Sequence, residues 1–189
     1  SADTRESVRR LVLVTGPARS GKSEWAETLA MRSGKSVIYV ATSQIDSTDL
    51  EWLARIEQHR RRRPATWITL PVPVELAATV QQASETSCLL VDSLGTWLAN
   101  LLDQDEDTWS RTQQEFLATL EQATSDVILV AEETGWGIVP AYPIGRTFRD
   151  RLGGLVRRVG AIAQAVYLVT GGHVLNLTDI GSPLPPPNA

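Results

Sequence analysis

The sequence predicts a three-layer α/β fold in which a mostly parallel sheet lies between helices and carries a P-loop for a nucleoside triphosphate. Two observations support this prediction. Short apolar runs alternate with longer segments of helical periodicity, a pattern typical of parallel sheets. The first apolar run also leads straight into a glycine-rich motif followed by a helical segment, which is the arrangement that binds phosphate at a helix N-terminus.

Six apolar runs are expected to be strands, at residues 11–15, 37–41, 66–70, 88–92, 127–131 and 166–170. Several are apolar throughout, as strands buried on both faces of a sheet are. Helices are expected at residues 22–32, 49–61, 73–85, 95–102, 108–123 and 145–163. Gly171-Gly172 and the run 173–177 then predict a tight hairpin with an antiparallel edge strand at the C-terminal side.

Length and composition favour one soluble domain. The 189 residues suffice for a single core, expected at residues 11–180, with a flexible leader at 1–10 and a proline-rich tail at 181–189. A net charge of -4 gives no general attraction to nucleic acid, and no apolar run approaches the ~18 residues of a membrane helix. The lone Cys88 is expected to be a buried thiol, which agrees with a cytoplasmic location.

The phosphate site is the best-defined feature of the sequence. Residues 16–23 match the P-loop pattern G-x-x-x-x-G-K-[ST] at every position, with the sequence Gly16-Pro17-Ala18-Arg19-Ser20-Gly21-Lys22-Ser23. Glycines let the backbone turn its N–H groups toward phosphate oxygens. We expect Lys22 to reach the β- and γ-phosphates, and the Ser23 hydroxyl to be a ligand of Mg²⁺.

An acidic partner for the metal is expected at the end of a later strand. Asp92 ends the apolar run 88–92 and is the candidate, although an Asp in this position also serves as a helix cap. Glu132 and Glu133 end the run 127–131 in the same way. From the residues, these two glutamates either bind metal or substrate, or face water.

The helix expected at 49–61 runs into a basic cluster that contains His59 and four consecutive arginines, Arg60 to Arg63. Its periodicity places Leu50, Leu53 and Ile56 on one face, and Pro64 ends it. Such a cluster is most often a solvated face, and in an acidic protein it is thin support for nucleic-acid binding. A neutral imidazole is also a competent nucleophile toward phosphorus, so catalysis by His59 is the alternative.

Taken together, several blocks resemble the bifunctional adenosylcobinamide kinase / adenosylcobinamide-phosphate guanylyltransferase family of cobalamin biosynthesis. The resemblance extends over about residues 11–177. Its blocks are residues 14–23 with Ala26-Glu27, residues 39–44, Arg55-Ile56 through His59-Arg60 to Arg63-Pro64 and Trp67, residues 89–94 and 97–102, Glu133, residues 135–140, Arg146 with 148–150, and residues 166–169. The Ala-Arg-Ser filling of the P-loop and the His-Arg block are the most specific of these.

The resemblance implies two reactions. ATP or GTP phosphorylates the aminopropanol hydroxyl of adenosylcobinamide, and GMP is then transferred from GTP to that phosphate through a GMP-histidine intermediate. It implies that His59 is the nucleophile and that Lys22 is the other catalytic residue. It further implies that Ser43, Gln44, Arg60, Arg63 and Asp92 join the P-loop in nucleotide binding, that Ser23 and Asp92 hold Mg²⁺, and that the protein is a homotrimer. Arg61 and Arg62 are left as surface charge.

Three positions depart from the family pattern. No acid follows Trp67 before Glu75, Glu132 stands where members tend to have asparagine, and Val156 stands where asparagine is common. Trp97, Trp136 and Tyr142 are candidates for packing on a corrinoid, with core packing as the alternative. Two other functions are open on the residues: a P-loop small-molecule kinase of another pathway, and a non-catalytic nucleotide-binding regulator.

Overall fold

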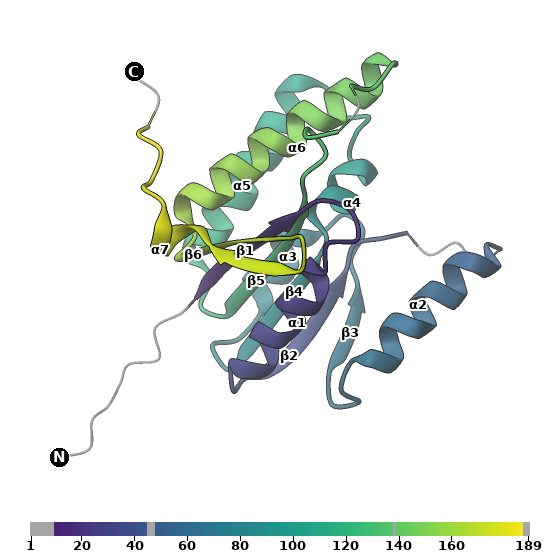
Figure 1. The fold of residues 1–189 in the computed structure, drawn as a ribbon, viewed down its shortest axis with the longest axis vertical. Helices are drawn as coiled ribbons and strands as arrows, with labels where there is room; N and C mark the ends of the chain where they lie inside the picture. Colours follow the sequence, from purple (N-terminus) through teal and green to yellow (C-terminus); the bar gives the residue numbers. More distant parts are fainter. Residues whose placement is uncertain (1–9, 45–47, 138, 187–189) are drawn as a thin grey trace.

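A computed structural model of the chain describes residues 10–44, 48–137 and 139–186. Its seven strands form one sheet in the order β3-β2-β4-β5-β1-β6-β7 (Figure 1). All neighbours pair in parallel except β6 and β7, which are antiparallel. The strands are β1 (Leu11–Gly16), β2 (Ser36–Ala41), β3 (Ile68–Pro71), β4 (Ser87–Asp92), β5 (Asp126–Glu132), β6 (Ala165–Thr170) and β7 (His173–Asn176).

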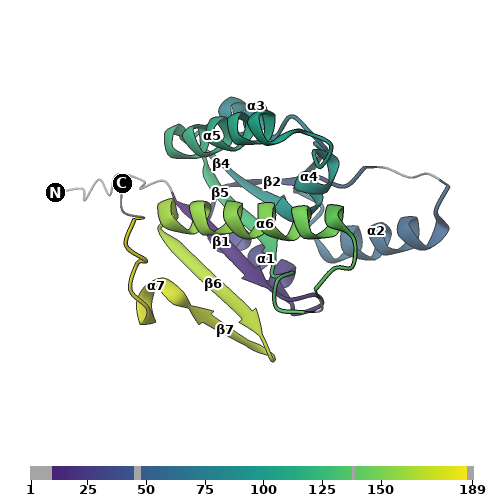
Figure 2. The same ribbon diagram turned by 90° about the horizontal axis from the view of Figure 1, so that it is seen from above.

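The helices lie on both sides of this sheet, which gives the three layers that the sequence predicts. They are α1 (Lys22–Arg32), α2 (Leu50–Arg62), α3 (Leu76–Gln82), α4 (Leu94–Asn100), α5 (Glu106–Gln122), α6 (Pro143–Ile162) and α7 (Leu177–Ile180). Figures 1 and 2 show α3 to α6 over one face of the sheet and α1 against the other.

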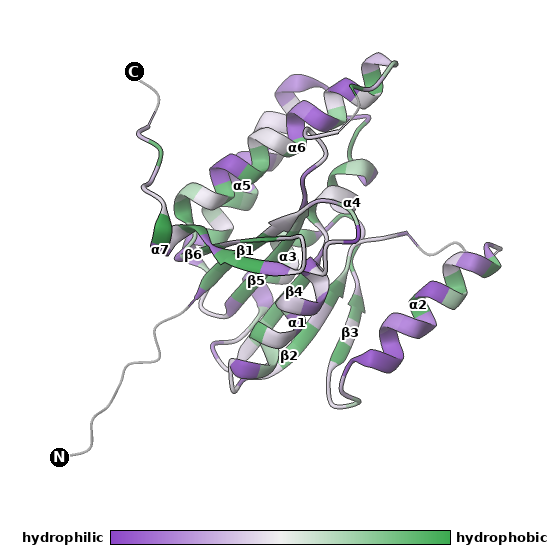
Figure 3. Ribbon diagram, in the orientation of Figure 1, coloured by the Kyte–Doolittle hydropathy of each residue, from purple (hydrophilic) through white to green (hydrophobic). Residues whose placement is uncertain are grey.

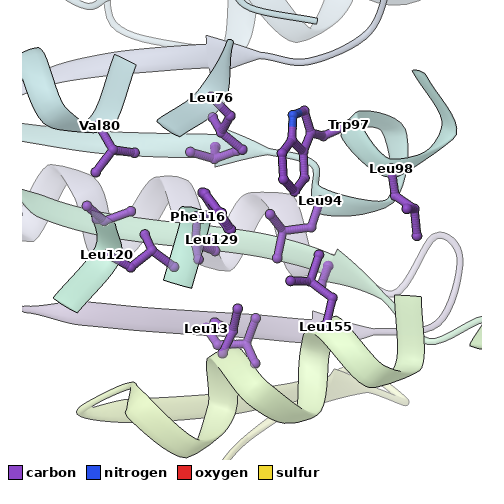
Figure 4. Close-up of a cluster of buried hydrophobic side chains, with 14 of the residues drawn as sticks. Leu13, Leu76, Val80, Leu94, Trp97, Leu98, Phe116, Leu120, Leu129 and Leu155 are labelled. Carbon is purple, nitrogen blue, oxygen red and sulfur yellow. The ribbon is translucent and has the colours of Figure 1, made fainter. Parts of the chain in front are cut away.

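Alternating side chains of the strands supply two cores. Toward α3–α6, Leu13 and Leu129 pack with Trp97, Phe116 and Leu155 in the larger cluster (Figure 4). Toward α1, a smaller cluster is built on intervening strand residues and on alanines of the helix. The central strands β1, β4 and β5 are therefore buried on both faces, as their continuous apolar runs predict.

Element identity is confirmed, with shifted ends. The strand expected at 66–70 is observed at Ile68–Pro71, and the helix expected at 73–85 is shorter, at Leu76–Gln82. The last long helix begins at Pro143, because proline fits the first helical turn, where its missing N–H is not needed. The edge strand ends at Asn176, whose side chain caps a short helix, α7, that the sequence did not predict.

Helix α2 is the least buried of the long helices. Figure 1 shows it beyond the sheet edge formed by β3, and Figure 3 shows that it is mostly hydrophilic. Asp49 caps its first turn by accepting a hydrogen bond from the Trp52 N–H. None of its residues is buried, and Leu50 is 78% exposed. The predicted apolar face therefore forms but has little to pack against in one chain.

Some expectations fall partly outside the described residues. The expected leader lies there except for Arg10, as do the last three residues of the tail. Within the part of the chain that is described, no helix is long and apolar enough to cross a membrane.

Candidate nucleotide and catalytic site

The expected site residues gather where parallel strands end. Gly16, Asp92 and Glu132 close β1, β4 and β5, and Gly16 pairs directly with Glu132 in the sheet register. Carboxyl ends of neighbouring parallel strands meet at one edge, which is where open α/β sheets bind ligands. The structure therefore brings the P-loop and both acidic strand ends together.

The P-loop backbone needs its glycines. A Cβ on Gly16 would lie 2.4 Å from the Val169 carbonyl oxygen of β6 and 2.7 Å from Ser20 Oγ. Gly21 has φ +92°, in the left-handed region that favours glycine, and it directly precedes the first residue of α1. These two positions set the turn that points the start of α1 toward the site.

Lys22 and Ser23 open α1 at this edge. Lys22 Nζ donates to the Pro17 carbonyl at 3.2 Å. This bond crosses the P-loop, where the phosphates are expected to bind. The Ser23 hydroxyl donates to Asp92 Oδ2 at 3.1 Å, and the Tyr39 hydroxyl donates to the same oxygen at 2.7 Å. Burial, and next the charge of Asp92, raise the pKa of Tyr39, so Tyr39 remains a donor.

These residues fit a magnesium ion. The oxygens of Ser23 and Asp92 are hard ligands of the type that Mg²⁺ prefers, and Mg²⁺ usually takes only one or two protein ligands beside phosphate and water. Across the described residues, no group of three or more His, Cys, Asp or Glu side chains forms a cage for a metal. The arrangement therefore suits a metal held jointly by protein and nucleotide.

The two glutamates that end β5 differ in their surroundings. Glu133 accepts a 2.6 Å hydrogen bond from Thr15, and its N–H donates to the Gly16 carbonyl. Glu132 Oε2 is buried, and among the described residues it has no hydrogen-bond partner. Burial raises the pKa of Glu132. Its carboxylate lies against Gly95, where a Cβ would come within 1.9 Å of Oε2. Neither glutamate is a plain solvent-facing residue.

Ser43 and Gln44 follow β2 at the same edge. The preceding Thr42 is fully buried, and its hydroxyl donates to the Ser93 carbonyl at 2.7 Å. Asn100 of α4 donates to the Thr42 carbonyl at 2.7 Å. This network, together with a hydrogen bond from the Thr42 N–H to the Asp92 carbonyl, fixes the end of β2 beside the end of β4, and Ser43 and Gln44 follow from there.

Among the described residues, His59 takes no part in the hydrogen bonds that join the P-loop to Asp92. It is half-buried in the last turn of α2, and the hydrogen bonds of the described residues include none between His59 and residues 16–23. Arg60 is exposed, whereas Arg63 stacks on the Tyr39 ring with its guanidinium carbon 3.6 Å from the ring centroid.

Arg62 was expected to be plain surface charge, and the structure shows instead that it is paired. It forms an ion pair with Glu27 of α1, whose side chain is 8% exposed. Sequence reasoning assigned no role to Glu27 or Tyr39. The available signals were a charged residue on the buried face of α1 and a hydroxyl in an apolar strand.

The aromatic candidates separate into two groups. Trp97 is 2% exposed, and its Nε1 donates to the Val74 carbonyl, so it belongs to the core. Trp136 and Tyr142 are 60% and 75% exposed, on the segment between β5 and α6.

Of the other departures from the family pattern, Val156 packs against the larger core cluster and Glu75 is exposed at the start of α3.

Solved structures share the fold. A Pyrococcus horikoshii OT3 protein known as PH0250 superposes with a TM-score of 0.53 at 9% identity, over 95% of this chain and 94% of that one. An ATPase of a bacterial type III secretion system superposes with a TM-score of 0.50 at 9% identity, over 90% of this chain and 53% of its own. At such identities the likeness shows the fold.

Sequence comparisons show the family. The family model of cobinamide kinase / cobinamide phosphate guanyltransferase matches residues 12–177. The bifunctional adenosylcobalamin biosynthesis protein CobP of Pseudomonas aeruginosa is 41% identical, over 91% of this chain and 98% of its own length. The corresponding protein CobU of Escherichia coli is 37% identical, over 86% and 96%. With its phosphate site and most of its length matched, the chain belongs to the cobinamide kinase / cobinamide phosphate guanyltransferase family of bifunctional enzymes.

Proposed function

We propose that one triphosphate site in this chain serves both reactions of the family. ATP or GTP phosphorylates adenosylcobinamide there, and GTP then gives GMP to adenosylcobinamide phosphate through a GMP-histidine at His59. The observation that carries the proposal is the meeting of Lys22, Ser23 and Asp92 at one sheet edge, where Ser23 Oγ lies 3.1 Å from Asp92 Oδ2. Family membership supports this enzyme over a kinase of another pathway or a non-catalytic regulator.

For phosphoryl transfer, residues 16–23 hold the triphosphate and the Lys22 ammonium neutralises charge on the γ-phosphoryl group as it moves to the substrate hydroxyl. Ser23 and Asp92 hold Mg²⁺, which offsets charge on the phosphate oxygens when bound. Ser43, Gln44, Arg60 and Arg63 complete the nucleotide site. Glu132 lies between Gly16 and the end of β4, so it faces the same space.

For guanylyl transfer, a His59 nitrogen bonds to the α-phosphorus of GTP and pyrophosphate leaves. An oxygen of adenosylcobinamide phosphate then attacks the same phosphorus and displaces the imidazole, giving adenosyl-GDP-cobinamide. Two displacements replace one difficult attack by a weak nucleophile. The chemistry requires a His59 nitrogen close to the α-phosphorus, and the turn of α2 that carries His59 is joined to the P-loop helix by the Arg62–Glu27 ion pair.

Three further assignments belong to this proposal. The exposed Trp136 and Tyr142 contact the corrinoid. Residues 11–180 form the single nucleotide-binding domain, which works as a homotrimer. The enzyme is cytoplasmic, which agrees with Cys88 being free and buried, with its pKa raised by burial to about 11.

The test is incubation with α-labelled GTP, followed by treatment of the labelled protein with acid or alkali. We expect covalent label that acid removes and alkali does not, as for a phosphoramidate on histidine. His59→Ala should abolish labelling and spare GTP binding. The chain's other histidine provides the control, since His173→Ala on exposed β7 should label normally. Labelling that persists in His59→Ala would overturn the histidine assignment.

The kinase half of the proposal has its own readout. Adenosylcobinamide and γ-labelled ATP or GTP should yield labelled adenosylcobinamide phosphate, and His59→Ala should retain this activity. Loss of both activities in a folded His59→Ala variant would contradict the division of roles.

A further inference from the structure

The last turn of α2 is bound to the P-loop helix by a two-pronged ion pair. Arg62 Nε donates to Glu27 Oε2 and Arg62 Nη2 donates to Glu27 Oε1, each at 3.0 Å. The third nitrogen, Nη1, reaches Glu24 Oε1 at 3.4 Å. Glu24 and Glu27 are three residues apart on α1, so they lie on one face of it.

The Arg62–Glu27 pair differs in kind from the ion pair between Arg61 and Glu57. The Glu27 side chain is 8% exposed and the Arg62 side chain 38%, and both Glu27 oxygens are used, so the contact is a partly desolvated bidentate bond. The hydrogen bond to Glu27 raises the pKa of Arg62. Arg61 instead pairs with Glu57 along α2, with both side chains at least half exposed, and such pairs contribute little.

A second contact ties the same turn to the metal-binding edge. The Arg63 guanidinium lies over the Tyr39 ring, and the Tyr39 hydroxyl donates to Asp92 Oδ2. Two successive arginines therefore connect the end of α2 to α1 on one side and to the end of β4 on the other. At the start of α2, by contrast, Leu50 is 78% exposed.

His59 lies one turn before these anchors. Residues three apart are neighbours on a helix surface, so His59 shares its face with Arg62, the last residue of α2. In the structure Arg62 turns to α1, and Arg63, just past the helix end, turns to Tyr39, while Arg61 points away with 79% of its side chain exposed.

We propose that Arg62 is a positioning residue for guanylyl transfer, acting through Glu27 to fix the turn of α2 that carries His59 relative to the P-loop helix. This inference rests on the proposed role of His59 as nucleophile. Arg62 itself takes no part in phosphoryl transfer to the cobinamide hydroxyl, which needs only the P-loop edge. If Arg62 has a positioning role, its loss slows guanylyl transfer and spares the kinase reaction. A merely structural role would slow both reactions.

The test compares rates of His59 labelling from α-labelled GTP at saturating GTP with rates of phosphoryl transfer to adenosylcobinamide. Arg62→Ala should label at least ~10-fold more slowly, because small misplacements of reacting groups have large effects on rate. GTP affinity and kinase rate should stay within about two-fold, since those groups are not moved. Arg62→Lys should restore labelling only in part, because an ammonium lacks the guanidinium fork. Arg61→Ala is the matched control and should match the unsubstituted enzyme in both reactions.

A second pair of variants covers the case in which Arg62→Ala, by leaving buried Glu27 without its cation, fails to fold. Glu27→Gln should slow labelling to a similar extent, and Glu27→Gln/Arg62→Ala should be no slower than the single variants. Additive losses, or equal losses of kinase and labelling rates, would overturn the inference. So would normal labelling by Arg62→Ala. Because His59→Ala tests the nucleophile separately, its loss of label beside normal labelling by Arg62→Ala would reject the inference and keep the proposed function.

Discussion

Lys22 and Asp92 each form hydrogen bonds within the protein. A bound nucleotide and its metal ion have to take the place of these hydrogen-bond partners. Lys22 is held by the Pro17 carbonyl, and Asp92 Oδ2 accepts from Ser23 and Tyr39. These bonds keep the charged groups in place before the ligand arrives. At the scale of single residues the site is therefore preorganised, which lowers the cost of ordering it on binding.

Lys22→Ala should weaken GTP binding by roughly 10- to 100-fold, because a hydrogen bond to a charged group contributes about 1.5–3 kcal/mol. Both reactions should weaken with it. Equilibrium titration with GTP provides the measurement. The chain's other lysine serves as control, since Lys35 pairs with Asp126 at the first residue of β5 and Lys35→Ala should bind GTP normally. Unchanged affinity in Lys22→Ala would count against the P-loop role of this residue.

Glu132 should make the protein less stable as the pH rises. Burial raises its pKa in the folded state, so the folded chain holds the proton more tightly than the unfolded chain does. The free energy of unfolding therefore falls as pH rises from the ordinary glutamate pKa, about 4.3, through the raised folded value. Glu132→Gln removes this loss and should be more stable at pH 7 by roughly 1 kcal/mol, with the difference vanishing near pH 4.

Urea unfolding at several pH values, without Mg²⁺ or nucleotide, measures this effect. Glu133→Gln is the control, because Glu133 accepts a hydrogen bond from Thr15 and should give no gain. A pH-independent difference between Glu132→Gln and the unsubstituted chain would contradict the argument.

Among the elements, α2 is the one whose bounds the sequence predicts well but whose contacts it does not. Its apolar period and Pro64 give a helix at nearly the observed bounds. Periodicity describes a helix face but not its partner, so the low burial of α2 and the pairing of Arg62 with Glu27 were not predictable. The P-loop was predictable because strand, loop and helix are adjacent in the sequence, and each constrains the next.

The same peripheral position predicts a contrast in stability. Ile56 of α2 is 38% exposed, whereas Leu155 of α6 is fully buried in the larger cluster. Leu155→Ala should lower the free energy of unfolding by about 2–5 kcal/mol, and Ile56→Ala by less than about 0.5 kcal/mol. Urea unfolding of the two variants makes the comparison. Similar losses would mean that the apolar face of α2 is covered in solution.

At the scale of the whole molecule, strand order creates the site. Asp92 and Gly16 belong to strands that are not neighbours, because β5 lies between β4 and β1 and brings Glu132 into the gap. Parallel strands with short apolar runs can be read from the sequence. Their order cannot, since it depends on which crossovers pack best rather than on any one segment. The position of Glu132 between the P-loop and Asp92 therefore emerged only in three dimensions.

The whole molecule also leaves apolar side chains exposed at the β3 edge of the sheet. On β3, which forms the sheet edge nearest α2, Ile68 is 58% and Leu70 38% exposed, beside the partly open face of α2. Contiguous apolar surface of this kind is typical of contacts between subunits. The proposed homotrimer would cover these apolar side chains of β3. A neighbouring subunit at this edge would also help to hold α2, and with it His59, during catalysis.

Sedimentation at micromolar concentration should therefore give one species of three times the 20.7 kDa chain mass. Ile68→Glu should shift this species toward the single chain, because a charge buried between subunits is strongly unfavourable. Leu184 is 66% exposed in the proline-rich tail, so Leu184→Glu is the matched control and should leave the trimer intact. A monomeric unsubstituted chain would reject the trimer. A trimer that tolerates Ile68→Glu would place the subunit contact elsewhere and leave the β3 edge free, so that α2 would move without constraint from a neighbour.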